Sequence, residues 1–131
     1  NEDAQVSTPG EIVPSDEFYS YNAKYIDGKS GLFIPAPISD ELIARVKELA
    51  LRTYKAIDCA GMARVDFLLD RDTNELYINE VNTIPGFTSI SMYPKLWDAS
   101  GLPYPALIER LVDLALDRKQ ERNKSKRTFG D

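Results

Sequence analysis

Two acidic residues interrupt apolar runs in the middle of the sequence, and an amide lies beside one of them. Asp66 lies within the run ARVDFLL, whereas Glu80 and Asn82 end the run LYINEVN, shortly before a Pro-Gly dipeptide. Oxygen ligands without nitrogen or sulfur suit a hard cation, and Mg²⁺ commonly takes one or two carboxylates and completes its shell with water and substrate phosphates. These residue types therefore indicate a candidate site for magnesium and phosphate.

A β-hairpin would bring these side chains together. Residues 64–70 and 76–82 are apolar runs joined by the five residues RDTNE, a polar link suited to a hairpin. If the register places Asp70 opposite Leu76, the further opposed pairs are Arg64–Asn82, Asp66–Glu80 and Leu68–Ile78. Opposed residues share a face of a sheet, so all of these are expected on one side. The other side is then expected to hold Val65, Phe67, Leu69, Tyr77 and Val81.

The polar cluster on this hairpin has two interpretations. A two-faced hairpin can simply point its charges at water. However, Leu68 and Ile78 would continue the same face as apolar groups, which favours a face that something covers. Arg64 beside a bound cation would then be available for a phosphate or a developing oxyanion.

Composition limits the classes of function. The chain has 131 residues, 43% of them hydrophobic, which predicts one domain with one core. A net charge of −5 argues against nucleic acid as a partner, and the basic segment RKQERNKSKR is interpreted as a solvated helix end. No run approaches the roughly 20 apolar residues of a membrane span. The single cysteine fits a reducing, cytoplasmic setting, and the absence of histidine leaves acid–base and ligand roles to other groups.

The elements that must position the cluster can be predicted from caps and periodicity. Residues 10–38 read as a strand, a long loop and an extended exit. Ser39 is a good N-cap for a helix that should end near Asp58, with Gly61 as the breaker, and a second amphipathic helix should begin at Pro105. We therefore predict an α/β fold of the α+β type, a mainly antiparallel sheet with helices packed on one face. The chain begins like an internal segment, so 1–131 is expected to be one fragment with frayed ends at 1–8 and 120–131.

Three segments carry a specific resemblance. ARVDFLL, YINEVNTIPGFTSISMYPKLW and EFYSYNAKY closely resemble the C-terminal part of bacterial D-alanine:D-alanine ligases, members of the ATP-grasp superfamily. The resemblance runs from about Pro9 to Arg118 in matching order and spacing. Other ATP-grasp enzymes keep an acid followed by Glu-x-Asn, whereas the continuation NTIPGFT and the segment SMYPKLW point to this branch.

The resemblance implies roles for the hairpin residues. Asp66, Glu80 and Asn82 match the family's magnesium ligands, with Glu80 bridging two ions across the phosphates of ATP. Mn²⁺ is the alternative to Mg²⁺ at these ligands. Arg64 matches the arginine that steadies the transferring phosphate and the tetrahedral intermediate.

Loop residues also receive roles from the resemblance. The Pro85-Gly86 turn is expected to give Gly86 a positive φ, with its N–H facing a developing oxyanion. Ser91 matches a residue that holds the carboxylate of the second D-alanine, and Lys24 and Tyr25 match a mobile loop that closes over the site, with lysine reaching phosphate. Each has a simpler alternative. Lys24 can be an ordinary loop charge, Tyr25 can pack the loop, Ser91 can be a turn hydroxyl, and Gly86 can be the second residue of a turn.

The implied activity is ATP-dependent formation of D-alanyl-D-alanine for peptidoglycan, through an acyl phosphate. The implied partners are ATP, two molecules of D-alanine and the missing N-terminal part of the same enzyme, which is expected to be a homodimer when complete. The fragment alone is expected to be inactive, because the first-substrate region and most of the adenine-binding surface have no counterpart in the sequence. The alternatives are another ATP-grasp carboxylate–amine ligase and a structural or binding module without catalysis.

Overall fold

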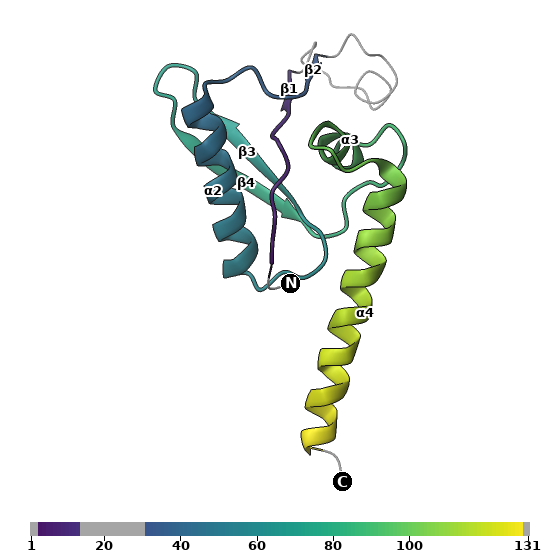
Figure 1. Cartoon of the computed structure of the whole chain (residues 1–131). Helices are drawn as coiled ribbons and strands as arrows, with labels where there is room; N and C mark the ends of the chain where they lie inside the picture. Colours follow the sequence, from purple (N-terminus) through teal and green to yellow (C-terminus); the bar gives the residue numbers. More distant parts are fainter. Residues whose placement is uncertain (1–2, 14–30, 130–131) are drawn as a thin grey trace.

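The computed structural model describes residues 3–13 and 31–129. Both sheets in this part of the chain are two-stranded and antiparallel, formed by β1 with β2 and by β3 with β4. With the helices, they give the α+β arrangement that the sequence predicts (Figure 1). The elements in chain order are β1 (Glu11–Ile12), β2 (Leu32–Phe33), α2 (Asp40–Ala56), β3 (Arg64–Leu69), β4 (Leu76–Asn82), α3 (Met92–Ala99) and α4 (Tyr104–Phe129).

The start of α2 follows the predicted capping pattern. Ser39 has extended backbone angles, and its hydroxyl accepts a hydrogen bond of 3.2 Å from the Leu42 N–H. Asp40 and Glu41 lie in the first turn, where carboxylates stabilise the positive end of the helix dipole. The helix then lies against the hairpin, chiefly along β3 (Figure 1).

The end of α2 differs from the prediction in one respect. The first residue in the left-handed conformation after the helix is Asp58, with φ of 55°; Gly61, with φ of 79°, follows three positions later and does not end the helix. The Asp58 N–H donates to the Lys55 carbonyl and the Cys59 N–H donates to the Tyr54 carbonyl, the paired hydrogen bonds of a Schellman motif. Aspartate tolerates this conformation better than most residues with a Cβ, which is why the helix can stop before the glycine.

The hairpin register is confirmed near the polar cluster and wrong beyond it. Arg64 is opposite Asn82 and Asp66 is opposite Glu80, but a β-bulge follows, so that Leu68 is opposite Tyr77 and Leu69 is opposite Leu76. The predicted pairs Leu68–Ile78 and Asp70–Leu76 are therefore not formed. The extra residue in β4 shifts the later alternation by one position, so Tyr77 joins the face of Asp66, and Ile78 joins the face of Phe67.

Helices α3 and α4 and the extended N-terminal segment pack together. Helix α3 lies beside α4 and against the extended N-terminal segment. Gly10 is so close to α3 that an added Cβ would lie 2.8 Å from Met92 Cε and 2.9 Å from Leu96 Cδ2. The Thr8 N–H also donates to Ser100 Oγ at 2.8 Å, just beyond the end of α3.

The hydrophobic core of the described residues is small. Its buried hydrophobic side chains are Ala36, Tyr93 and Leu107. In contrast, large apolar side chains such as Ile84, 81% exposed, and Leu68, 58% exposed, lie at the surface. None of the helices in the described ranges is long and apolar enough to cross a membrane.

Candidate active site

The centre of the candidate site is an ion-pair cluster on one face of the β3–β4 hairpin. Arg64 Nε donates to Asp66 Oδ1 at 2.8 Å, and Arg64 Nη2 donates to Asp66 Oδ2 at 2.9 Å, so the guanidinium and the carboxylate form a two-pronged pair. Glu80 approaches the same guanidinium, with 3.8 Å between Oε1 and Nη2. Alternation along β3 puts Arg64 and Asp66 on one face, and the register puts Glu80 opposite Asp66.

Exposure differs among these three side chains. Those of Arg64 and Asp66 are 24% and 29% exposed, whereas that of Glu80 is 60% exposed. The guanidinium is therefore held in a partly sheltered position by Asp66, while Glu80 reaches further into solvent. Partial shelter strengthens charge-assisted hydrogen bonds relative to a fully exposed pair.

Asn82 joins the cluster at the end of β4, opposite Arg64. Its side-chain Oδ1 accepts a hydrogen bond of 3.0 Å from the Ile84 N–H, which turns the chain out of the strand. An amide oxygen has two lone pairs, so Oδ1 keeps one for a cation while it shapes the turn. Asn82 therefore links the hairpin to the following loop, residues 83–91.

The loop 83–91 places Gly86 beside Ser91. Gly86 does not have the positive φ that the Pro85-Gly86 dipeptide predicts, so the turn is not type II. The space beside this glycine is tight instead, because an added Cβ would lie 3.1 Å from Ser91 Oγ, which would have to shift by a few tenths of an ångström. Gly86 is exposed, and within the described part of the chain its N–H donates to no protein atom. The role of this amide toward an oxyanion stays a prediction, and the positive φ expected for it is wrong.

Ser91 is buried, at 7% exposure, and is already engaged within the loop. Its Oγ accepts a hydrogen bond of 3.0 Å from the Thr88 N–H and lies 2.8 Å from Thr88 Oγ1. It does not cap α3, although it is the N-cap residue. A contact with a substrate carboxylate would therefore involve Thr88 as well. The three-residue spacing of the hydroxyls in TSIS is the sequence signal that could have identified Thr88.

Two further residues that hold this loop were not identified from the sequence. The Tyr104 hydroxyl donates to the Phe87 carbonyl at 2.8 Å, and the Phe87 ring packs against the rings of Tyr104 and Tyr93, with centroids 5.4 and 6.0 Å apart. Tyr104 and Phe87 are 17 positions apart in the sequence, so no local pattern predicts this contact.

Several expectations fall elsewhere. Lys24 and Tyr25 lie outside the described residues.

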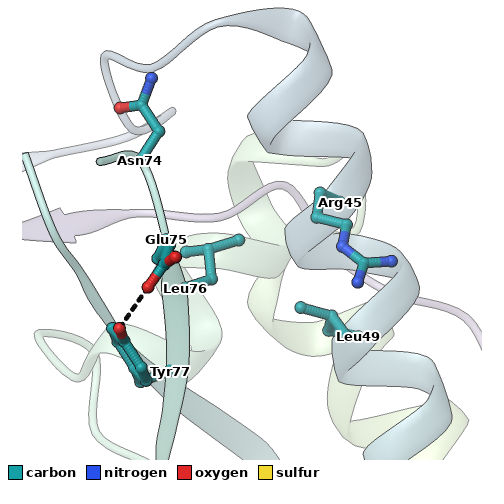
Figure 2. A pocket seen from close by; sticks show the side chains of 6 residues that line it. All are labelled: Arg45, Leu49, Asn74, Glu75, Leu76 and Tyr77. Atoms are coloured by element: carbon teal, nitrogen blue, oxygen red, sulfur yellow. Dashed lines mark hydrogen bonds between the residues drawn. The ribbon is translucent and has the colours of Figure 1, made fainter.

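A surface pocket of about 310 Å³ between α2 and the turn of the hairpin is lined by Arg45, Leu49, Asn74, Glu75, Leu76 and Tyr77. Figure 2 shows this pocket, in which the Tyr77 hydroxyl donates a hydrogen bond to the Glu75 carboxylate. None of the predicted site residues lines it, so the chemistry is not expected there.

The chemistry of the donor set fits magnesium. Within 3–13 and 31–129 there is no group of three or more His, Cys, Asp or Glu placed to hold a metal. The hairpin instead offers Asp66 and Glu80 in opposed positions, with Asn82 two residues further. Two carboxylates and an amide oxygen leave coordination positions for water and phosphate, which is the common pattern for Mg²⁺. Each Asp66 oxygen accepts one hydrogen bond from Arg64 and keeps a second lone pair.

Comparison with known proteins decides the family. The family model described as "D-ala D-ala ligase C-terminus" matches residues 1–113. The chain belongs to this family. It is 60% identical over 123 residues to the D-alanine–D-alanine ligase of Thermoanaerobacter sp. strain X514, covering 93% of this chain and 34% of that protein. As a D-ala D-ala ligase C-terminus, it thus spans about a third of its relative's length.

Solved structures agree with the family. The D-alanine-D-alanine ligase from Coxiella burnetii superimposes with a TM-score of 0.79 at 39% identity, covering 95% of this chain and 32% of that one. The D-alanine–D-alanine ligase from Bacillus anthracis complexed with ATP gives a TM-score of 0.64 at 34% identity, over 70% of this chain and 31% of that one. The ligase C-terminal fold predicted from the sequence motifs is therefore confirmed.

Proposed function

We propose that this chain is the C-terminal part of an ATP-dependent D-alanine:D-alanine ligase and supplies its metal- and phosphate-binding end. The observation that supports this most strongly is the pairing of Asp66 with Glu80 beside the Arg64 guanidinium, on a hairpin that leads into the Gly86–Ser91 loop. Adjacent segments of the chain thus provide a site for a hard cation, an arginine that can bind phosphate, and an available backbone N–H.

The proposed reaction has two steps. A carboxylate oxygen of one D-alanine attacks the terminal phosphorus of ATP, giving an acyl phosphate and ADP. The amine of a second D-alanine then attacks the acyl carbon, the carbon–oxygen bond to phosphate breaks, and the amine loses a proton as the dipeptide forms. A free carboxylate does not react with an amine, so ATP is needed to provide the leaving group.

The side chains of the hairpin would bind the magnesium ions and the transferring phosphate in this reaction. Asp66, Glu80 and Asn82 would hold two magnesium ions, with Glu80 shared between them. Magnesium, when bound, neutralises phosphate oxygens and favours phosphoryl transfer. Arg64 would bind the transferring phosphate through the N–H groups that now face Asp66 and Glu80.

The loop would act on the second step. The exposed Gly86 N–H would donate to the oxyanion of the tetrahedral intermediate, where a preorganised donor lowers the barrier. Ser91, together with Thr88, would bind the carboxylate of the second D-alanine, and Lys24 and Tyr25 would close over the substrates. The adenine pocket and the site of the first D-alanine would come from the remaining part of the enzyme. We place the complete enzyme in the cytoplasm, where ATP is supplied, as a homodimer.

Isotope transfer in the full-length protein tests this proposal. With ATP, Mg²⁺ and D-alanine labelled with ¹⁸O in its carboxylate, the released phosphate should carry ¹⁸O, because the attacking oxygen leaves with phosphorus. The dipeptide should appear in equal amount to ADP. Residues 1–131 alone should form no dipeptide. Unlabelled phosphate, or release of ADP without D-alanine, would contradict the acyl-phosphate route.

A further inference from the structure

The loop that presents Gly86 has a local hydrogen bond near each of its ends. At its start, Asn82 Oδ1 accepts from the Ile84 N–H, and at its end Ser91 Oγ accepts from the Thr88 N–H. The segment between these anchors contains Pro85, which is buried, and Gly86, which is exposed. The position of the Gly86 N–H therefore depends on what holds the next residue, Phe87.

Phe87 is held by α4. The hydroxyl of Tyr104, the first residue of α4, donates to the Phe87 carbonyl at 2.8 Å, and the bond is partly buried. The Phe87 ring contacts that of Tyr104, with centroids 5.4 Å apart at 46°, and that of Tyr93 from α3, with centroids 6.0 Å apart at 42°. Tilted aromatic pairs at these distances are mutually attractive. Figure 1 shows the connection from β4 passing beside the start of α4.

We propose that Tyr104 is a positioning residue for the Gly86 amide. Its hydroxyl fixes the Phe87 carbonyl, and with it the backbone that carries the Gly86 N–H, in the orientation that meets the oxyanion. The inference deepens the proposed function and rests on it. Tyr104 touches no substrate in this role; it acts through Phe87 on the donor.

The hydroxyl and the ring of Tyr104 have separable effects. The ring packs on Phe87, which stabilises the fold, whereas the hydroxyl alone restrains the backbone carbonyl. Tyr104→Phe keeps the ring and removes the restraint. A small rotation of the loop would then misdirect the Gly86 N–H, and a misaligned oxyanion donor loses much of its effect on the transition state.

The test uses the full-length ligase with Tyr104→Phe and, as a matched control, Tyr77→Phe. Tyr77 lies near the turn of the hairpin, and its hydroxyl is bonded to the neighbouring Glu75. Four quantities are measured: kcat, the Kd of ATP, the inhibition constant of a phosphinate analogue of the dipeptide, and the thermal midpoint. The phosphinate is tetrahedral and anionic at the reacting centre, so its affinity reports on the oxyanion donor.

Tyr104→Phe should lower kcat about threefold to tenfold and weaken the phosphinate by a similar factor, with the Kd of ATP unchanged. Tyr77→Phe should match the wild type in all of these. Equal kcat and equal phosphinate affinity in Tyr104→Phe and the wild type would overturn the inference. So would a lowered thermal midpoint with ATP and phosphinate weakened alike, since that pattern indicates a purely structural role. A wild-type protein that forms no dipeptide would instead refute the proposed function itself.

Discussion

The guanidinium of Arg64 and the carboxylate of Asp66 meet through two parallel hydrogen bonds of 2.8 and 2.9 Å, although the residues are neighbours on one face of a single strand. Adjacent same-face positions on a strand are far enough apart that both side chains must turn toward each other. The pair therefore orients the arginine before a phosphate arrives. It also places a positive charge beside the carboxylate that is proposed to bind magnesium.

Replacing Arg64 by lysine tests whether the two-pronged geometry matters. Lysine keeps the charge but cannot make both hydrogen bonds in one plane. We expect Arg64→Lys to lower kcat of the complete ligase roughly tenfold or more, with a smaller change in the Kd of ATP. Arg45→Lys, an exposed residue of α2 paired only with Glu48 among the described residues, serves as the matched control. An unchanged kcat in Arg64→Lys would show that charge alone is sufficient.

The proposed magnesium ligands can be tested without a change in side-chain size. Asp66→Asn or Glu80→Gln removes one negative charge from the cluster, so each should lower turnover at least tenfold. Mn²⁺ binding, measured by electron paramagnetic resonance in the presence of a non-hydrolysable ATP analogue, should weaken in parallel. Glu48→Gln on the exposed face of α2 provides the control. Near-normal turnover at saturating Mg²⁺ would remove these residues from the metal site.

Tyr25 is predicted to favour an amine acceptor over D-lactate. A protonated histidine at this loop position would repel an ammonium group, whereas a neutral tyrosine adds no charge. Tyr25→His should therefore shift the product ratio toward the D-lactate ester, and more so at pH 6 than at pH 8, because the imidazole is protonated at the lower pH. Competition between D-alanine and D-lactate across this range measures the ratio. The same ratio in both proteins would place selectivity elsewhere.

Asp58 offers a test of backbone energetics. It is an exposed residue with φ of 55°, where a Cβ is unfavourable. Asp58→Gly should raise the free energy of unfolding by roughly 0.5 kcal/mol. The substitution relieves backbone strain in the folded state, and this gain exceeds the cost of the greater conformational entropy that glycine gives the unfolded chain. Gly101→Ala is the reciprocal variant, since φ is 95° and an added Cβ meets nothing within 4 Å. It should be destabilised, as judged by urea denaturation, and a stable Gly101→Ala would contradict this account.

Tyr93 should make stability depend on alkaline pH. Burial raises the pKa of the Tyr93 hydroxyl, and the nearby Tyr54 adds to this, whereas a hydrogen bond with Trp97 lowers it. A raised pKa in the folded state means that the native protein holds its proton after the unfolded chain has lost it. Stability is then full below the unfolded pKa of about 10 and falls as pH rises above it.

The matching variant is Tyr93→Phe, which has no proton to lose. Its urea midpoint should fall less than that of the wild type between pH 9 and 11.5. The difference at pH 8, below the titration, measures only the lost hydrogen bond and is subtracted. Parallel curves for the two proteins would show that Tyr93 does not contribute to alkaline destabilisation.

The sequence by itself determined the elements that depend on local chemistry. Ser39 and the residues after it specified the start of α2, and alternation in β3 and β4 placed Arg64, Asp66, Glu80 and Asn82 on one face. The quoted motifs were enough to identify the ligase family. These features depend on neighbours in the chain, or on a register set by a short turn, so their patterns are visible in the letters.

Only the tertiary structure decided the features that depend on contacts between distant segments. The bulge next to the Asp66–Glu80 pair exchanged the faces of Tyr77 and Ile78. One extra residue in a strand reverses the face of every side chain on the far side of the bulge, without any change in composition. Gly86 proved to lie close to the Ser91 hydroxyl and to lack a positive φ. The bond from Tyr104 to Phe87 joins a helix to a loop across 17 residues, and only the packing of α3 and α4 brings those two groups together.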